Sequence, residues 1–266
     1  MRSVVALVMA SWRTALSYRL RILLSFGSVL VAVVPIYFVS GALQSTMAPS
    51  IQGQGGQYFG FLIAGVVTYS LISWAVHELP GALGSGIRTG TLEALFATPA
   101  RLPALLAGLS GYGLLRAALR AGVLLGAAAV LGMHIAWGRT LSAVVILALL
   151  VLAYAGIGLL AGASVLAFRT SGPLSTIVLA GSALLGGVYY PTHVIPSWIR
   201  QFSAIIPLTY GLRALRGTLL EGRSLYGVRG DVLALVVFLV VLCGAGGLAF
   251  GIALRYARRS GTLAQY

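Results

Sequence analysis

The sequence predicts an all-helical integral membrane protein with six transmembrane helices in a single domain. Two observations predict this class. The composition is 59% hydrophobic and only 8% charged, whereas a soluble domain carries about 25% charged residues. Mostly apolar runs of about 20 residues, the length that crosses a bilayer, recur along the chain, and arginines punctuate them.

The predicted spans are the apolar runs long enough to cross the hydrocarbon core. In chain order they cover residues 22–43, 58–79, 109–137, 141–168, 172–190 and 232–254. The segment before them, residues 1–21, carries arginines and predicts a helix on the membrane surface, with Arg2 and Arg13 on one side. A plain cytoplasmic lead-in is the alternative. The apolar run that follows is too long for a cleaved signal peptide.

All 18 basic residues are arginines, and only four acidic residues oppose them, so the net charge is +14. The absence of lysine excludes an ATPase of the Walker type, a lysine Schiff-base enzyme and a protein kinase. The arginines separate apolar runs instead of gathering on a solvated face, which argues against nucleic-acid binding. The three histidines are far apart and Cys243 has no cysteine partner, so we expect neither a metal site nor a disulfide.

The arginines also predict the orientation of the chain. Counting them by the positive-inside rule places both termini in the cytoplasm, with Arg255, Arg258 and Arg259 after the last span. Arg213 and Arg216, three residues apart, are expected to share a helix face at the outer interface and to snorkel. The outer arginines conflict with the rule, and the sequence does not fix their role: Arg200, Arg213, Arg216, Arg223 and Arg229.

The segment 191–216 is apolar but broken by Pro191, Pro196 and Pro207, each of which removes a backbone donor. Such a segment beside a full span predicts a re-entrant outer hairpin, because broken backbone at membrane depth needs protein or water around it.

Arg116 and Arg120 are four residues apart and share one helix face. They are expected at the inner end of the third span. The simpler interpretation is that both side chains snorkel to the inner headgroups. The alternative is that they line a cavity for an anionic group.

The loop after the second span predicts a short helix over residues 90–98. Gly90 interrupts the chain, Thr91 can cap the helix, and Glu93 lies in its first turn, where a carboxylate is favourable. Pro99 disfavours helix at the residue before it. A capped helix between two spans, parallel to the inner surface, is well placed to contact a cytoplasmic partner.

This segment, GTLEALFATPARL at residues 90–102, resembles the coupling-helix signature of type-2 ABC exporter permeases. A second segment, residues 187–216, is similar to the family's block between spans five and six: an aromatic residue before Pro191, Pro196 two residues before Trp198, the Pro207-Leu-Thr run, and then arginines. Order and spacing match, and the resemblance covers essentially the whole chain.

The resemblance implies a dimer of permeases, homomeric or heteromeric, that binds two copies of a cytoplasmic ABC ATPase. ATP and Mg²⁺ would bind to that partner and no cofactor to this chain, which would not itself be an enzyme. It also implies a bacterial plasma-membrane location. The implied ATPase-coupling residues are Arg88, Thr91, Leu92, Glu93, Leu95 and Phe96. The implied residues of the substrate path or outer gate are Tyr69, Trp74, Tyr189, Tyr190, Pro191 and Trp198.

The implied function is ATP-driven export of an amphipathic substrate, such as a drug, an antibiotic or a lipid-like molecule. Export of lipid-linked polysaccharide or teichoic-acid precursors is the alternative. A polytopic membrane enzyme is a distant one, because Asp231 is the only aspartate and His77-Glu78 has no second histidine four residues after the first. The coupling segment argues against a subunit that only anchors a partner.

We predict that Glu93→Ala uncouples ATP hydrolysis from transport, because Glu93 is expected to form a salt bridge to the ATPase. Transport and ATP hydrolysis by the assembled complex would be measured side by side. Unchanged transport would mean that Glu93 only favours the N-terminus of its own helix.

Overall fold

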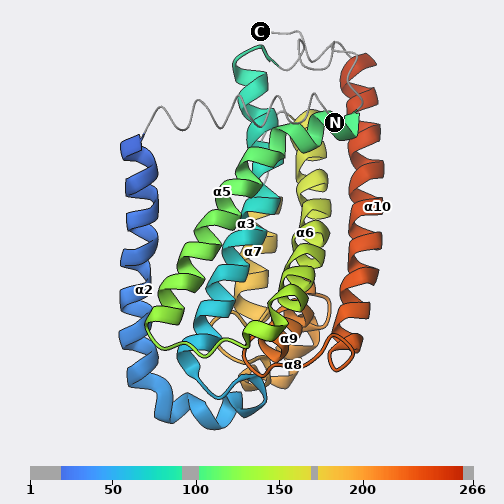
Figure 1. Cartoon of the computed structure of the whole chain (residues 1–266). Helices are drawn as coiled ribbons and strands as arrows, with labels where there is room; N and C mark the ends of the chain where they lie inside the picture. The colour runs from blue at the N-terminus through green and yellow to red at the C-terminus, as the bar shows by residue number, and fades with distance from the viewer. Residues whose placement is uncertain (1–18, 92–101, 169–172, 260–266) are drawn as a thin grey trace.

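The computed structural model describes residues 19–91, 102–168 and 173–259, and every regular element in these ranges is a helix (Figure 1). The long helices are α2 (Arg19–Met47), α3 (Tyr58–Arg88), α5 (Leu102–Val130), α6 (Thr140–Phe168) and α10 (Arg229–Arg259). The shorter ones are η1 (Ala48–Gln54), η2 (Trp137–Arg139), α7 (Leu174–Leu185), η3 (Thr192–Val194), α8 (Ser197–Ser203) and α9 (Pro207–Leu219).

The five long helices are long and apolar enough to cross a membrane. In Figure 1 they run roughly side by side, and α8 and α9 lie together at the bottom of the bundle. We call that bottom end the loop end. The opposite end, where α2 begins and α10 finishes, is the termini end.

Helix α3 lies at the centre of the bundle. Within its most apolar stretch 72% of the residues are buried, against 11% in α2 and in α10. It packs against α2, α5 and α6, and α6 packs in turn against α10. Because α2 and α10 leave large apolar side chains exposed, for example Phe38 and Leu248, their outer faces are suited to lipid or to another protein.

Among the long helices, the largest differences from the predicted spans are in α3 and α5. Helix α3 continues nine residues beyond position 79, to Arg88, and α5 occupies 102–130 instead of 109–137. The shift in α5 places Arg116 fourteen residues from each end of its helix, which is about 21 Å at 1.5 Å per residue. The candidate membrane span within α5 is Gly113–Val130, so both arginines lie in its first half, and their expected place at the inner end of the span stays a prediction.

The fifth predicted span, residues 172–190, corresponds to α7. This helix has 12 residues, or about 18 Å, which is shorter than the roughly 30 Å hydrocarbon core. The described chain thus contains five span-length helices and one short apolar helix, and the count of six is not confirmed.

The segment 191–216 is divided by its prolines. Pro191 precedes η3, Pro196 precedes α8, and Pro207 is the first residue of α9. A proline fits the start of a helix because its missing N–H has no partner there in any case. The insertion of the segment 191–216 into the outer leaflet as a re-entrant hairpin stays a prediction.

Two predicted elements lie largely outside the described residues. They are the surface helix, of which only residues 19–21 are described, at the start of α2, and the helix at 90–98, of which only Gly90 and Thr91 are described. At its described edge, α3 ends at Arg88 and Gly90 has a φ of 68°, a left-handed conformation that interrupts the helix.

Helix α10 packs closely against α6 at Gly246. A Cβ atom added to Gly246 would overlap the carbonyl oxygen of Gly156 and lie 2.9 Å from the Cβ atom of Leu159. Gly247, the next residue of α10, has no described atom within 4 Å of that position. The two glycines are therefore in contrasting surroundings on one helix.

We predict that Gly246→Ala lowers the free energy of unfolding by about 1–3 kcal/mol, because the methyl group forces the two backbones apart. Gly247→Ala is the matched control. It adds helix propensity and no clash, and should be neutral or stabilising by up to about 1 kcal/mol. Thermal unfolding of the two variants in the same detergent measures the difference, and equal midpoints would contradict the packing described here.

Candidate functional site

A pocket of about 440 Å³ lies between α2, α3 and α5, and we call it the arginine pocket. Helix α3 contributes most of its polar and aromatic lining. The pocket brings Tyr69 and Trp74, two residues expected in the substrate path, together with Arg116 and Arg120. Its full lining is Ala32, Val66, Tyr69, Ser70, Ser73, Trp74, Arg116, Ala117, Arg120, Ala121 and Leu124.

The α3 wall of this pocket is set by a close approach of α5. A Cβ atom at Gly113 would overlap both the indole nitrogen of Trp74 and the carboxylate of Glu78. Only glycine at that position lets α5 come this near to α3. Glu78 also interacts electrostatically with Arg116 across the gap, although the two groups do not form an ion pair within 4 Å.

The two pocket arginines, Arg116 and Arg120, have exposed side chains. In the part of the chain that the structure describes, neither guanidinium makes a hydrogen bond or a salt bridge. An arginine at the centre of a spanning helix costs about 3 kcal/mol or more when lipid surrounds it. Their place in the pocket lining fits the cavity interpretation, and snorkelling to the inner headgroups stays the alternative.

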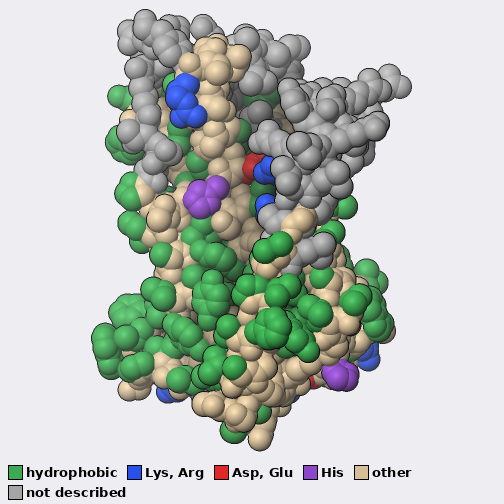
Figure 2. All heavy atoms as spheres, turned by 90° about the vertical axis from the view of Figure 1, so that its left-hand side faces the viewer, with side chains coloured by type: hydrophobic (Ala, Val, Ile, Leu, Met, Phe, Trp, Pro, Cys, Tyr) green, Lys and Arg blue, Asp and Glu red, His purple; other side chains and the backbone are tan. Residues whose placement is uncertain are grey.

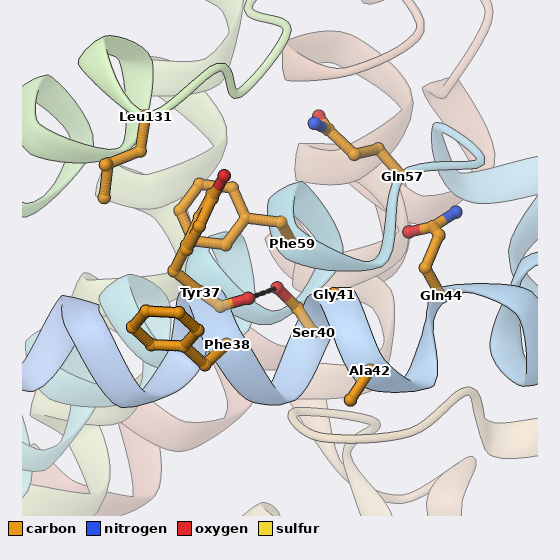
Figure 3. A pocket seen from close by; sticks show the side chains of 9 residues that line it. All are labelled: Tyr37, Phe38, Ser40, Gly41, Ala42, Gln44, Gln57, Phe59 and Leu131. Atoms are coloured by element: carbon orange, nitrogen blue, oxygen red, sulfur yellow. Dashed lines mark hydrogen bonds between the residues drawn. The ribbon is translucent and has the colours of Figure 1, made fainter.

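A second pocket, of about 430 Å³, lies nearer the loop end and is shown in Figure 3. The rings of Tyr37 and Phe59 meet edge to face in it, with centroids 5.4 Å apart. We call it the loop-end pocket. It is lined by Tyr37, Phe38, Ser40, Gly41, Ala42, Gln44, Gln57, Phe59 and Leu131.

Both glutamine amides of the loop-end pocket are committed to the fold. The Gln44 side chain donates to the carbonyl of Gly56 and accepts from the N–H of Tyr58. The Gln57 side chain likewise donates to Gly132 and accepts from His134. The two pockets have nearly the same volume, but only the arginine pocket has charged groups that the fold leaves unused, and we therefore take it as the candidate site.

The predicted outer-gate residues are dispersed. The phenol groups of Tyr69 and Tyr189 are near enough to interact electrostatically. Tyr190 donates a hydrogen bond to Leu184 instead, and Pro191 is buried before η3. Trp198, on α8, is 70% exposed and is not part of either pocket.

Arg216 is buried at the loop end, with 2% of its surface exposed. Its guanidinium donates to the carbonyls of Gly187 and Val188, at 2.9 and 3.1 Å, and to the carbonyl of Phe61 at 3.0 Å. A fourth bond, of 3.2 Å, reaches the side chain of Gln54. The expectation that Arg216 snorkels at the outer interface is wrong, because these four acceptors replace its hydration.

The ring of Phe61 completes the Arg216 site. The centre of the guanidinium lies 3.4 Å from the ring centroid, which is a close cation–π contact. Burial lowers the pKa of Arg216 to about 9, and the group therefore keeps its charge at neutral pH. The local sequence offers one signal for burial, since Arg216 stands among small and apolar residues of α9 from Gly211 to Leu219.

The other predicted outer arginines have less demanding surroundings. Arg213, which is half exposed, pairs with Asp231 at 3.2 Å, and Arg223 pairs with Glu221 at 2.7 Å. Arg229 lies over the ring of Tyr226. Arg200 is exposed on α8.

Of the predicted ATPase-coupling residues, only Arg88 and Thr91 lie in the described chain. Both are exposed at the termini end, and the Thr91 hydroxyl shares a hydrogen bond with Thr89 at 2.9 Å. The other four predicted contacts, Leu92, Glu93, Leu95 and Phe96, lie outside the described residues.

Several apolar span-length helices around a pocket with unpaired charges define a multi-pass membrane protein of the transport class. The chain belongs to the ABC-2 type transporter family, whose sequence profile matches residues 2–220. The match runs to the residue after α9, so it includes the arginine pocket and Arg216. Membrane domains of this family are transport components, and they work with a separate ATPase subunit.

Two curated relatives carry the name Nodulation protein J. The sequence from Rhizobium leguminosarum bv. trifolii is 28% identical over 188 residues, which is 70% of this chain and 71% of the relative. The sequence from Rhizobium leguminosarum bv. viciae is 26% identical over 188 residues, covering 70% and 72%.

We predict that Arg216→Met destabilises the protein by about 3–5 kcal/mol, because it leaves several buried carbonyl groups without a donor. Arg216→Lys should recover only part of this loss, since an ammonium group cannot reach four acceptors and stack on Phe61. Arg213→Met, one turn earlier in α9, is the control. It removes an exposed ion pair worth about 0–1 kcal/mol. Similar thermal midpoints for Arg216→Met and Arg213→Met would contradict this account.

Proposed function

We propose that this chain is the membrane-spanning subunit of an ATP-driven exporter in a bacterial plasma membrane, with both termini in the cytoplasm. A second permease protomer and two copies of a cytoplasmic ABC ATPase complete the transporter. ATP and Mg²⁺ bind to the ATPase, which supplies the phosphate-binding lysine that this chain lacks. Membership of the ABC-2 type transporter family supports the division of labour.

The single observation that carries the choice of substrate is the arginine pocket. Its lining combines aromatic rings, small apolar residues and two unpaired cations, Arg116 and Arg120. A ligand with an apolar body and a polar or anionic group fits such a lining, because the rings and the guanidinium groups favour different parts of it. The proposed substrate is accordingly amphipathic, of the drug, antibiotic or lipid-like kind.

The chain path connects this pocket with the proposed ATPase contact. Residues 89–101 join α3 to α5, and these are the two helices that supply ten of the eleven pocket residues. A rigid helix transmits a displacement along its whole length, so a push on this connection shifts Trp74 relative to Arg116. Helix α3 also carries Phe61, whose carbonyl holds Arg216, so the same push acts on the loop end.

Export of lipid-linked polysaccharide or teichoic-acid precursors is the alternative. The flat faces of Tyr69 and Trp74 suit a sugar ring as well as an apolar chain. The similarity to the two Nodulation protein J sequences is consistent with this alternative.

We predict that Ala117→Trp, which fills the arginine pocket, abolishes ATP-dependent uptake of amphipathic fluorescent probes into inverted membrane vesicles that contain the chain and its ATPase. Ala117 lines the pocket, whereas the neighbouring Ala118 is exposed and does not. Ala118→Trp is therefore the matched control and should retain uptake.

Both variants must co-purify with the ATPase, which shows that assembly is intact. A partner ATPase whose phosphate-binding lysine is replaced by alanine should give no uptake with any variant. Normal uptake by Ala117→Trp, in vesicles where the ATPase remains bound, would remove the pocket from the transport path.

A further inference from the structure

The arginine pocket presents two guanidinium groups from one face of a single helix. Arg116 and Arg120 are separated by one turn of α5, which places their Cβ atoms about 6 Å apart. Both side chains are exposed within a pocket lined otherwise by aromatic, hydroxyl and apolar groups. Two forked donors at this spacing can reach one multi-oxygen anion together.

The pocket lies far from either end of its helices. Arg116 is at the midpoint of α5, about 21 Å from both ends. Both arginines lie within the candidate membrane span Gly113–Val130, where a cavity, a counter-charge or reach to the headgroups must compensate an arginine. Figure 2, which faces α2, shows basic and acidic side chains meeting part-way along this face, above a lower half dominated by hydrophobic side chains.

The local charges do not balance. Glu78, one turn beyond Trp74 on α3, is half-buried and interacts electrostatically with Arg116. Two arginines and one glutamate leave one positive charge among the described residues in and beside the pocket. A singly charged anion would therefore neutralise the site, and a dianion would overcompensate it.

From this geometry we infer that Arg116 and Arg120 bind the singly charged phosphodiester group of an amphipathic molecule, whose apolar chain lies against the small residues of α2 and α5. The planar guanidinium fits phosphate oxygens with two parallel hydrogen bonds. The inference rests on the proposed function and names its substrate class. The phosphodiester belongs either to the transported molecule or to a resident phospholipid.

The test for binding uses the full chain in nanodiscs, without an ATPase. With Trp12, Trp137 and Trp198 replaced by phenylalanine, Trp74 is the only tryptophan and reports from the pocket lining. Brominated acyl chains quench tryptophan on contact. Brominated phosphatidylglycerol, whose phosphodiester carries the only charge, is compared with brominated phosphatidylcholine, whose net charge is zero.

We expect quenching of Trp74 to favour phosphatidylglycerol by about tenfold, because the choline cation of phosphatidylcholine offsets the attraction of its phosphodiester to the guanidinium groups. The preference should fall to about one in the variant Arg116→Gln with Arg120→Gln. Arg139→Gln, which changes an exposed arginine of η2 outside the pocket, should keep it. Native mass spectrometry of retained lipid in the chain with all four tryptophans gives a second readout that does not depend on the tryptophan replacements.

A preference that survives the double variant, or quenching by brominated oleate equal to that by phosphatidylglycerol, would overturn the inference. A second arm distinguishes the two sources. Fluorescent phosphatidylglycerol in vesicles with the ATPase and ATP changes leaflet if it is transported, and stays in place if it is a resident lipid. Binding without any ATP-driven transport, of lipid or of the amphipathic probes, would support the site and contradict the proposed function.

Discussion

The charge of Arg216 imposes the strongest constraint on this fold. A cation with 2% of its surface exposed is tolerated only where hydrogen-bond acceptors replace water. The acceptors here come from η1, from α3 and from the turn after α7. Helix α9 therefore cannot leave α3 without leaving an unpaired charge in a low-dielectric interior, so the Arg216 contacts hold η1, α3, α9 and the turn after α7 together.

The same residue type has the opposite role in the arginine pocket. Both terminal nitrogens of Arg216 are bonded within the fold, and only its Nε lacks a partner. Arg116 and Arg120, in contrast, make no hydrogen bond to the described chain and face a pocket. A buried charge that the protein satisfies contributes rigidity. A charge that the protein leaves unsatisfied is available to a ligand, and its cost is recovered only when that ligand binds. The number of hydrogen bonds to the protein therefore distinguishes Arg216, a structural residue, from Arg116 and Arg120, the proposed binding residues.

Helix α3 links the three regions of interest. Its termini end leads into the proposed ATPase contact at Arg88, its middle carries Tyr69 and Trp74, and its loop end carries Phe61 over Arg216. Glycines allow this helix and its neighbours to approach closely, as Gly113 does for α5 and Gly246 does where α10 meets α6. Because these backbones are in contact, a displacement of one end of α3 would also displace the helices packed against it.

The sequence by itself determined the membrane class, four of the span helices to within a few residues at most ends, the proline-initiated short helices and the family. These features follow from local physics, because the length of an apolar run, a proline ring and the glycine at position 90 each act on their own segment.

The sequence placed α5 seven residues too late, since residues 131–137 are apolar enough to continue a span. In the fold they leave the helix, with Met133 buried and the N–H of Ala136 bonded to the carbonyl of Leu219. The sequence also paired Tyr69 and Trp74 with the substrate path, but not with Arg116 and Arg120 in one pocket. Only the tertiary structure decided that Arg216 is buried and that Arg116 is not. Two of the four acceptors of Arg216, at Phe61 and Gln54, lie 155 and 162 residues away along the chain, and contacts over such distances leave no periodic pattern in the sequence.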